Sequence, residues 1–270
     1  MTSSLCRRAL VAAILFCCAC GAASAADSTQ ERSWEMQVGR QQYDQYLQRG
    51  EIVPSQSPLY AVIDPIGDAI AAVANAQYFA PFHFLLLAQP APNAFSMPGG
   101  NVYVTTGMLS LLKNRDELAG VLCHEVNHDI HHDMYNVYQL TGGAGGPGDP
   151  QAASYERAAE TNADRAGAYL CAKAGFNPWG MVWNFRLYRQ MTGASHESSA
   201  SSDHPSDQQR VADLIALFDG DKATFGRFQD DVADAQPLSL PYGAVSRQQP
   251  YPAYPPYAPP PPPPCYPNCR

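Results

Sequence analysis

Five consecutive residues, His124 to His128, could bind a metal ion and supply a catalytic base. The preceding segment 116–123 is rich in helix-forming residues, and Asn114 is of a type that caps helices. On a helix, histidines four residues apart lie on one face about 6 Å apart along the axis, close enough to ligate one Zn²⁺. Glu125 then projects beside the metal, where it could take a proton from water. The pattern H-E-x-x-H on a helix is typical of zinc metalloproteases.

Two further histidines follow this motif, but they are poor candidates for the same metal. His132 would lie about 12 Å from His124 along a helix axis, which one ion cannot bridge. The extended metzincin motif requires Gly and His at positions that His131 and Met134 occupy here. We therefore predict that His131 and His132 form a partly solvated helix end, where imidazoles suit the negative pole of the helix.

A catalytic zinc needs a third protein ligand, and a second predicted helix around residues 154–167 offers carboxylates. This helix should follow the breaker-rich loop 142–150 and end near Gly175. Glu160 and Asp164 lie on one face, so one carboxylate could ligate zinc while the other accepts the N–H of a ligand imidazole. The residue types alone leave Glu156 as an equal rival ligand. They also leave open that the pair is a solvated acidic face.

Four segments occur in this order along the chain: N-A-F-S-M-P-G-G at 93–100 with T-G-M-L at 106–109, E-L-A-G-V-L-C at 117–123 before the His-Glu motif, E-T-N-A-D at 160–164, and H-P-S-D-Q-Q-R at 204–210. Together they resemble the HtpX-like and BepA-like zinc metallopeptidases, which are related to the CAAX prenyl protease and the mitochondrial Oma-type protease. The resemblance spans roughly residues 34–220, and relatives usually have Leu where Met108 stands.

The resemblance implies one Zn²⁺ per chain, with Glu160 as the third ligand beside His124 and His128. It implies that Asp164 supports a ligand or acts as an acid. It also implies that His204 stabilises the transition state or acts as a switchable fourth ligand, and that Arg210 orders the substrate or the site. From the residues alone, His204 could equally be a loop histidine and Arg210 the charge at the start of a helix.

The implied fold class is α+β, a mainly helical gluzincin domain with a small β-hairpin or sheet beside the active-site helices. Apolar spacing of three to four residues between Trp34 and Ala76 predicts helices that break at 54–58. The segments 82–88 and 102–104 have strand propensity and suggest a hairpin. Its edge could bind an extended peptide through main-chain hydrogen bonds, or it could simply cover the core.

The N-terminus predicts export. Two arginines, Arg7 and Arg8, precede an apolar run at 9–19 and the small residues 23–25, as in a secretory signal peptide cleaved after Ala25. Lipidation at Cys20 is a second option. No later segment has eighteen uninterrupted apolar residues, so we expect no integral membrane span in the mature chain, and a periplasmic location in a diderm bacterium.

The remaining chain divides at Pro237. Residues 26–236 have the length of one catalytic domain, and residues 237–270 form a tail rich in Pro and Tyr that should not pack a core. The tail could be a spacer or a docking segment for envelope partners or cell-wall material. The net charge of −8 argues against nucleic acid as a partner.

Four cysteines remain after the predicted signal peptide. Cys265 and Cys269 lie in the tail, where a local disulfide is possible. Cys123 and Cys171 lie on the two predicted ligand helices. They could form a disulfide in an oxidising compartment or stay buried thiols.

The sequence therefore predicts a zinc endopeptidase of the bacterial cell envelope that hydrolyses misfolded or unassembled proteins, with Glu125 as general base. The alternative is a latent or chaperone-like zinc protein in which His204 closes the site. The intact Glu125 favours the enzyme, because a protein that only binds would not need it.

Overall fold

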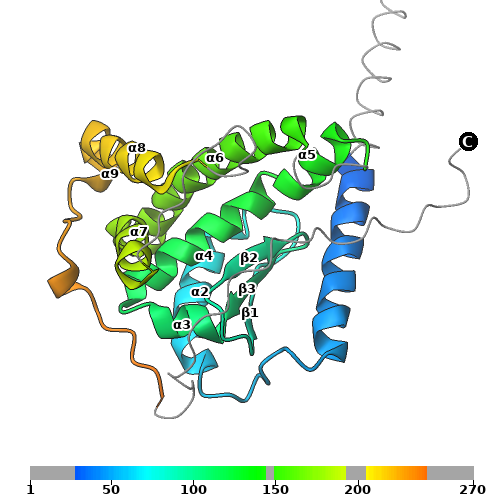
Figure 1. The fold of residues 1–270 in the computed structure, drawn as a ribbon, viewed down its shortest axis with the longest axis horizontal. Helices are drawn as coiled ribbons and strands as arrows, with labels where there is room; N and C mark the ends of the chain where they lie inside the picture. The colour runs from blue at the N-terminus through cyan, green and yellow to red at the C-terminus, as the bar shows by residue number, and fades with distance from the viewer. Residues whose placement is uncertain (1–27, 144–148, 193–204, 242–270) are drawn as a thin grey trace, which may run out of the picture.

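The computed structural model describes residues 28–143, 149–192 and 205–241 (Figure 1). The predicted signal peptide, Cys20, His204 and the two tail cysteines lie outside these residues. The elements are a helix at 28–48, α2 (Tyr60–Ala74), β1 (His83–Leu87), β2 (Ala94–Met97), β3 (Asn101–Thr105), α3 (Thr106–Leu111), α4 (Arg115–Ile130), α5 (Asp133–Leu140), α6 (Pro150–Ala174), α7 (Trp179–Thr192), α8 (Asp207–Gly220), α9 (Lys222–Phe225) and the short 3₁₀ helix η1 (Val232–Asp234).

The predicted α+β class is confirmed, because helices surround a small mixed sheet with strand order β1-β3-β2. One detail of the prediction is wrong. Strand β1, within the predicted segment 82–88, pairs with β3 in parallel and does not form a hairpin with it. Strand β2, which lies between them in the chain, makes the antiparallel hairpin with β3.

The hairpin turns at Gly99 and Gly100, and both need the conformational freedom of glycine. Their φ angles are 91° and 84°, in the left-handed region that side chains disfavour. A Cβ atom on Gly100 would lie 2.3 Å from the carbonyl oxygen of Pro81, so space also excludes a side chain. The turn therefore holds β2 in a fixed position at the edge of the sheet.

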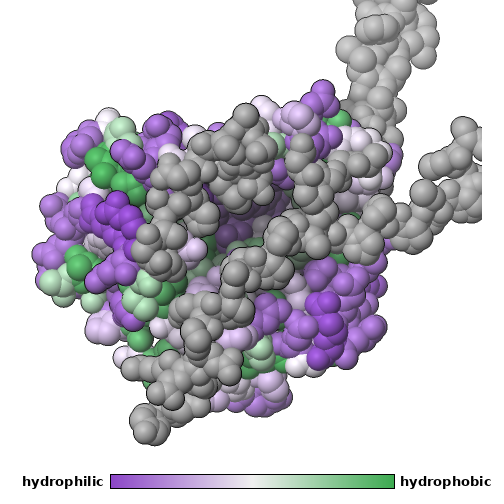
Figure 2. All heavy atoms as spheres, in the orientation of Figure 1, coloured by the Kyte–Doolittle hydropathy of each residue, from purple (hydrophilic) through white to green (hydrophobic). Residues whose placement is uncertain are grey.

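The main core lies between α2, the sheet and α4, and it includes Ile63, Ile66, Leu86, Val104, Leu118 and Leu122. A second cluster joins α6 to α7, α8 and α9 through Ala168, Val182, Leu214, Phe218 and Phe225. On the face shown in Figure 2, hydrophilic and hydrophobic residues are interspersed. No helix in the described part of the chain combines the length and the apolar character needed to cross a membrane.

Helix α4 has a well-defined start. As predicted, Asn114 is its N-cap: the side chain accepts a hydrogen bond from the Glu117 backbone N–H at 2.8 Å. In return, the Glu117 carboxylate accepts from the Asn114 backbone N–H at 3.3 Å, which completes a capping box. These reciprocal bonds fix the register of the helix, and with it the direction in which His124 and His128 point.

The end of α4 is more ordered than the sequence suggests. His131 is exposed at the C-cap, whereas His132 takes a left-handed conformation with φ 55° and starts α5. The His132 Nδ1 atom lies 2.9 Å from an oxygen of Glu35 and 3.1 Å from one of Glu31, both in the helix at 28–48. His132 therefore links the helix at 28–48 to the end of α4, a role that the expectation of a solvated helix end missed.

Glu35 also connects to the hairpin turn. The Tyr78 hydroxyl donates to Glu35 at 2.8 Å and accepts from the Gly99 backbone N–H at 2.9 Å. Glu35 is 1% exposed, so these partners stand in for water. Hydrogen bonds thus join the helix at 28–48, the hairpin of β2 and β3, and the end of α4.

The predicted domain limits stay a prediction, but the first residues of the predicted tail pack against the body. Pro237 forms a β-bridge with Asn114, and the Leu238 backbone N–H donates to the Lys113 carbonyl at 2.8 Å. Leu238 and Leu240 contact the main core. Apolar side chains therefore extend the ordered body a few residues into the tail; residues 242–270 lie outside the described part of the chain.

The contact between His132 and Glu35 predicts a pH-dependent stability. The hydrogen bond to Glu35, outweighing partial burial, raises the pKa of His132 above its usual value. The stabilisation is then fully present below the unfolded pKa of about 6.5 and is lost as the pH rises through the folded pKa. We expect the wild type to exceed His132→Gln in free energy of unfolding most clearly near pH 6 and least at alkaline pH. Urea titrations across this range, with the exposed neighbour His131→Gln as control, measure the difference; a pH-independent difference would contradict the assignment.

Candidate metal centre

Three side chains converge between α4 and α6: His124 and His128 from α4 and Glu160 from α6. The Nε2 atoms of the two histidines lie 3.1 Å apart. One Glu160 oxygen lies 3.3 Å from His124 Nε2, and the other lies 3.4 Å from His128 Nε2. The side chains are 10–18% exposed, so the group is largely shielded from solvent. The rival candidate Glu156 is not part of this group.

The convergence depends on a close approach of the two helices. Gly167 of α6 faces α4, and a Cβ atom there would lie 3.2 Å from the Cys123 carbonyl group and from the His124 nitrogen. Ala163, one turn earlier, is fully buried. Small residues at this contact bring the α6 backbone near enough for Glu160 to reach both histidines.

The structure has Cys123 and Cys171 as buried free thiols, with Cys171 donating to the Ala119 carbonyl at 3.3 Å.

A carboxylate lies at the other nitrogen of each imidazole. His124 Nδ1 is 3.0 Å from an Asp164 oxygen, and His128 Nδ1 is 2.8 Å from an Asp133 oxygen. Because an ionised carboxylate can only accept, each Nδ1 carries a proton, and the Nε2 atom of each ring faces the centre, where it can bind a metal once its own proton has left.

These donor atoms fit a cation. Two Nε2 atoms and a carboxylate face one another within about 3.4 Å, an arrangement that needs positive charge, either protons on the imidazoles or a metal cation among the donors. Ligand atoms around a tetrahedral Zn²⁺ are about 3.3–3.4 Å apart, given bonds of 2.0–2.1 Å. Two imidazoles and a carboxylate also form a donor set typical of catalytic zinc. The group therefore has the chemistry and the size of a zinc site.

Protons compete with a metal for this centre. Burial opposes a charge on His124, but Glu160 and Asp164 outweigh it and raise the pKa of His124 to about 9. The same balance, with Asp133 and Glu160 against burial, raises the pKa of His128 well above its usual value. Metal binding must displace these protons, so it should be favoured by rising pH.

Arg210 of α8 closes the other side of the centre. Its guanidinium binds both oxygens of Asp164 at 2.7 Å, lies 3.1 Å from a Glu160 oxygen, and stacks 4.8 Å from the ring centre of Phe185. Burial would raise the pKa of Asp164, but the ion pair with Arg210 outweighs it and lowers that pKa. The structure thus brings together two residues, Asp164 and Arg210, that are 46 positions apart in the chain.

Glu125 lies next to the centre and contacts the sheet edge. Its carboxylate accepts a hydrogen bond from the Ser96 backbone N–H of β2 at 3.2 Å. Burial, opposed by His124, His128 and Arg210, raises the pKa of Glu125. A carboxylate with a raised pKa is a stronger base, as proton abstraction from water requires.

The sequence did not indicate Asp133 and Tyr155. Asp133 lies five residues after His128, beyond the end of α4, so helical periodicity gives it no face in common with the motif. The left-handed His132 interrupts the helical path between α4 and α5, and an Asp133 oxygen lies 2.8 Å from His128 Nδ1 just after this break. Tyr155 stood within the predicted second helix but carried no ligand signal.

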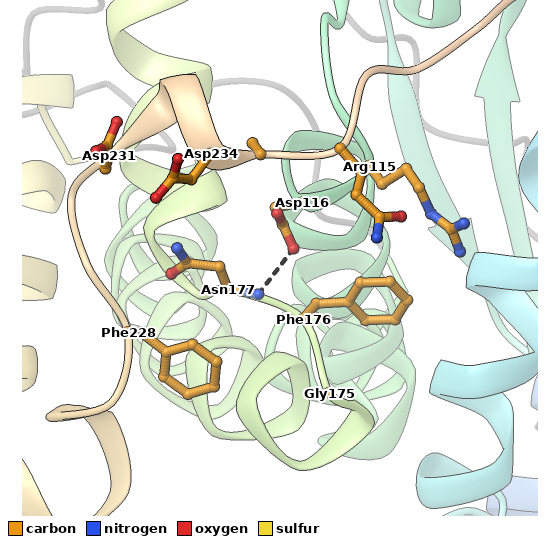
Figure 3. A pocket seen from close by; sticks show the side chains of 10 residues that line it. Arg115, Asp116, Gly175, Phe176, Asn177, Phe228, Asp231 and Asp234 are labelled. Carbon is orange, nitrogen blue, oxygen red and sulfur yellow. Dashed lines mark hydrogen bonds between the residues drawn. The ribbon is translucent and has the colours of Figure 1, made fainter.

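Two other features lie apart from the centre. Glu31, Glu35 and His132 also have converging ligand atoms, but one imidazole nitrogen shared by two carboxylates is explained as an ion pair. A cavity of about 440 Å³ lies at the opposite, N-terminal end of α4. There the Asp116 carboxylate accepts from the Asn177 backbone N–H at 2.8 Å, a contact that joins the start of α4 to the segment after α6 (Figure 3).

Comparison with known proteins agrees with this geometry. Residues 61–144 match the model of Peptidase family M48. The chain is 28% identical over 223 residues to the beta-barrel assembly-enhancing protease of Escherichia coli, covering 70% of this chain and 45% of that protein. The resemblance inferred from the sequence is confirmed.

Two mitochondrial relatives extend the comparison. Over 183 residues the chain is 27% identical to the metalloendopeptidase OMA1 of Schizosaccharomyces pombe, covering 59% of this chain and 53% of that protein. Over 222 residues it is 26% identical to the OMA1 of Saccharomyces cerevisiae, covering 68% and 63%. The chain thus spans about half the length of the E. coli relative. The residues that match the family model include the H-E-x-x-H residues 124–128.

The buried ion pair predicts a stability test. Replacing Arg210 with Met leaves the buried charges of Asp164 and Glu160 without their cation, so we expect a loss of about 3–5 kcal/mol in the free energy of unfolding. The control is Arg186→Met, which breaks a similar two-oxygen contact with Asp230 at the surface, where the side chains are 46% and 34% exposed. It should cost less than about 1 kcal/mol. Urea unfolding with a chelator present separates the two; equal losses would contradict the role of Arg210.

Proposed function

We propose that this chain is a zinc-dependent endopeptidase in which His124, His128 and Glu160 hold the metal and Glu125 is the general base. The observation that carries this proposal is the convergence of two Nε2 atoms and one carboxylate within 3.1–3.4 Å, with Glu125 beside them. Relatives that are named as a protease and as metalloendopeptidases support the reaction class.

The chain's own residues divide the work of peptide hydrolysis. When bound, Zn²⁺ supplies Lewis-acid chemistry that acidifies water and polarises a carbonyl group. Glu125 takes the proton from the attacking water and passes it to the leaving amine. Asp164 orients His124, and Arg210 holds Asp164 and Glu160 in place. By the family resemblance, His204 would stabilise the oxyanion or close the site.

The sheet edge suggests how a substrate binds. Strand β2 is the edge strand nearest Glu125, and one of its backbone N–H groups already contacts that carboxylate. An extended peptide that pairs with β2 would place its main chain beside the metal, and main-chain pairing tolerates many sequences. This favours unfolded segments, so we propose misfolded or unassembled proteins as substrates and no role for nucleic acid.

The cellular setting is part of the same proposal. A signal peptide at 1–25 would export a catalytic domain at 26–236 to the periplasm, with residues 237–270 available for envelope partners. The printed name of the E. coli relative, a beta-barrel assembly-enhancing protease, supports an envelope role.

The decisive variant is Glu125→Gln, which removes the base but not the ligands. We expect unchanged zinc content and a cleavage rate lower by a factor of about 10²–10⁴, the usual contribution of a general base. Glu160→Gln should lose zinc, whereas Glu156→Gln on the same helix should keep both zinc and activity. Cleavage of an unfolded protein such as casein, measured beside zinc content, tests all three.

Two outcomes would contradict the proposal. Near-normal cleavage by Glu125→Gln would remove Glu125 as the base, and zinc loss in Glu156→Gln but not in Glu160→Gln would reassign the ligand. In the same assay, His204→Ala should lower the rate. A silent wild type that becomes active in His204→Ala would instead favour the latent protein.

A further inference from the structure

We propose that Asp133 and Tyr155 are positioning residues that set the orientation and the tautomer of His128 for metal binding. The inference rests on the proposed function, because it assigns a role toward the same metal. It concerns residues outside the H-E-x-x-H and E-x-x-A-D motifs.

A chain of short hydrogen bonds leads to His128. An Asp133 oxygen lies 2.8 Å from His128 Nδ1, and the Tyr155 hydroxyl donates to the other oxygen at 2.8 Å. Asn136 donates to the Tyr155 hydroxyl at 2.8 Å and so holds the ring in place. Asp133 is 9% exposed. With both oxygens bound, its carboxylate has little freedom to turn.

The chain of bonds joins three helices. His128 is on α4, Asp133 and Asn136 are on α5, and Tyr155 is on α6. Asp133 lies in the first turn of α5, directly after the left-handed His132, and the hydrogen bonds run outward from His128 through Asp133 to Tyr155 and Asn136. Without the Asp133 contact, α5 and α6 would no longer hold the His128 ring in its orientation.

The carboxylates that contact the two histidines differ in whether a cation shares their charge. Asp164, the partner of His124, shares its charge with the Arg210 guanidinium. Asp133, the partner of His128, is bound instead by the neutral hydroxyl of Tyr155. An unshared carboxylate charge makes the opposite nitrogen of the ring a better electron donor. We therefore expect the Asp133 contact to strengthen the binding of the metal by His128.

The experiment compares zinc dissociation constants of the full chain, measured by competition with a chromophoric chelator. Asp133→Asn should weaken zinc binding by a factor of about 10–100, the usual effect of removing the partner of a ligand histidine. Tyr155→Phe removes one neutral hydrogen bond and should weaken binding by a factor of about 5.

The chain offers a matched control on the same helix. The Tyr169 hydroxyl of α6 donates to Asp221 at 3.0 Å, the same pair of residue types away from the metal centre. Tyr169→Phe and Asp221→Asn should leave the zinc dissociation constant unchanged. The unfolding temperature with chelator, and its rise on adding zinc, separate positioning from general stability: in Asp133→Asn the zinc-induced rise should shrink relative to the control variants.

The outcomes separate this role from the proposed function. Equal zinc dissociation constants for the wild type and Asp133→Asn would overturn the role of Asp133 but would leave the proposed function in place. If Asp133→Asn does not fold, Tyr155→Phe decides, and a constant equal to that of Tyr169→Phe would overturn the proposal. A wild type that binds no zinc would overturn the proposed function and this role with it.

Discussion

The metal centre depends on the close contact between α4 and α6. The donors come from both helices, so the backbones must lie near enough for Glu160 to reach His124 and His128. Gly167 permits this, because a Cβ atom there would press on the Cys123 carbonyl group and the His124 nitrogen at 3.2 Å. The cost of a glycine within a helix, about 1 kcal/mol, is offset by the approach that it allows. Capping of α4 by Asn114 then fixes which way the histidines point.

The same contact concentrates negative charge, and the rest of the site responds to it. Glu125, Asp133, Glu160 and Asp164 all lie around two imidazoles. Buried carboxylates are costly unless paired. Arg210 neutralises one side, hydrogen bonds from Tyr155 and Ser96 support Asp133 and Glu125, and a cation at the centre would complete the balance. This charge arrangement accounts for the polar contacts that α5 and α8 make with α6 at the site.

Local sequence signals predicted the parts of the site that a single helix places. The spacing of His124 and His128, the N-cap at Asn114 and the shared face of Glu160 and Asp164 follow from helical periodicity and capping chemistry. The resemblance to a known family then separated Glu160 from Glu156, which residue types alone left equal.

The parts that depend on breaks between elements or on distant pairings could not be predicted in this way. The contact between Asp133 and His128 crosses the break at His132, whose left-handed conformation non-glycine residues seldom adopt. The pairing of His132 with Glu35 joins residues 97 positions apart, and no local pattern encodes it. The parallel pairing of β1 with β3 likewise places the later strand β3 between β1 and β2 in the sheet, an order that no local pattern specifies.

The most direct test of the central claim is anomalous diffraction at the zinc absorption edge from crystals of the protein loaded with one equivalent of Zn²⁺. The account predicts a single strong anomalous peak bounded by His124 Nε2, His128 Nε2 and the Glu160 carboxylate. A peak at the other converging group, Glu31, Glu35 and His132, with none between α4 and α6, would contradict it.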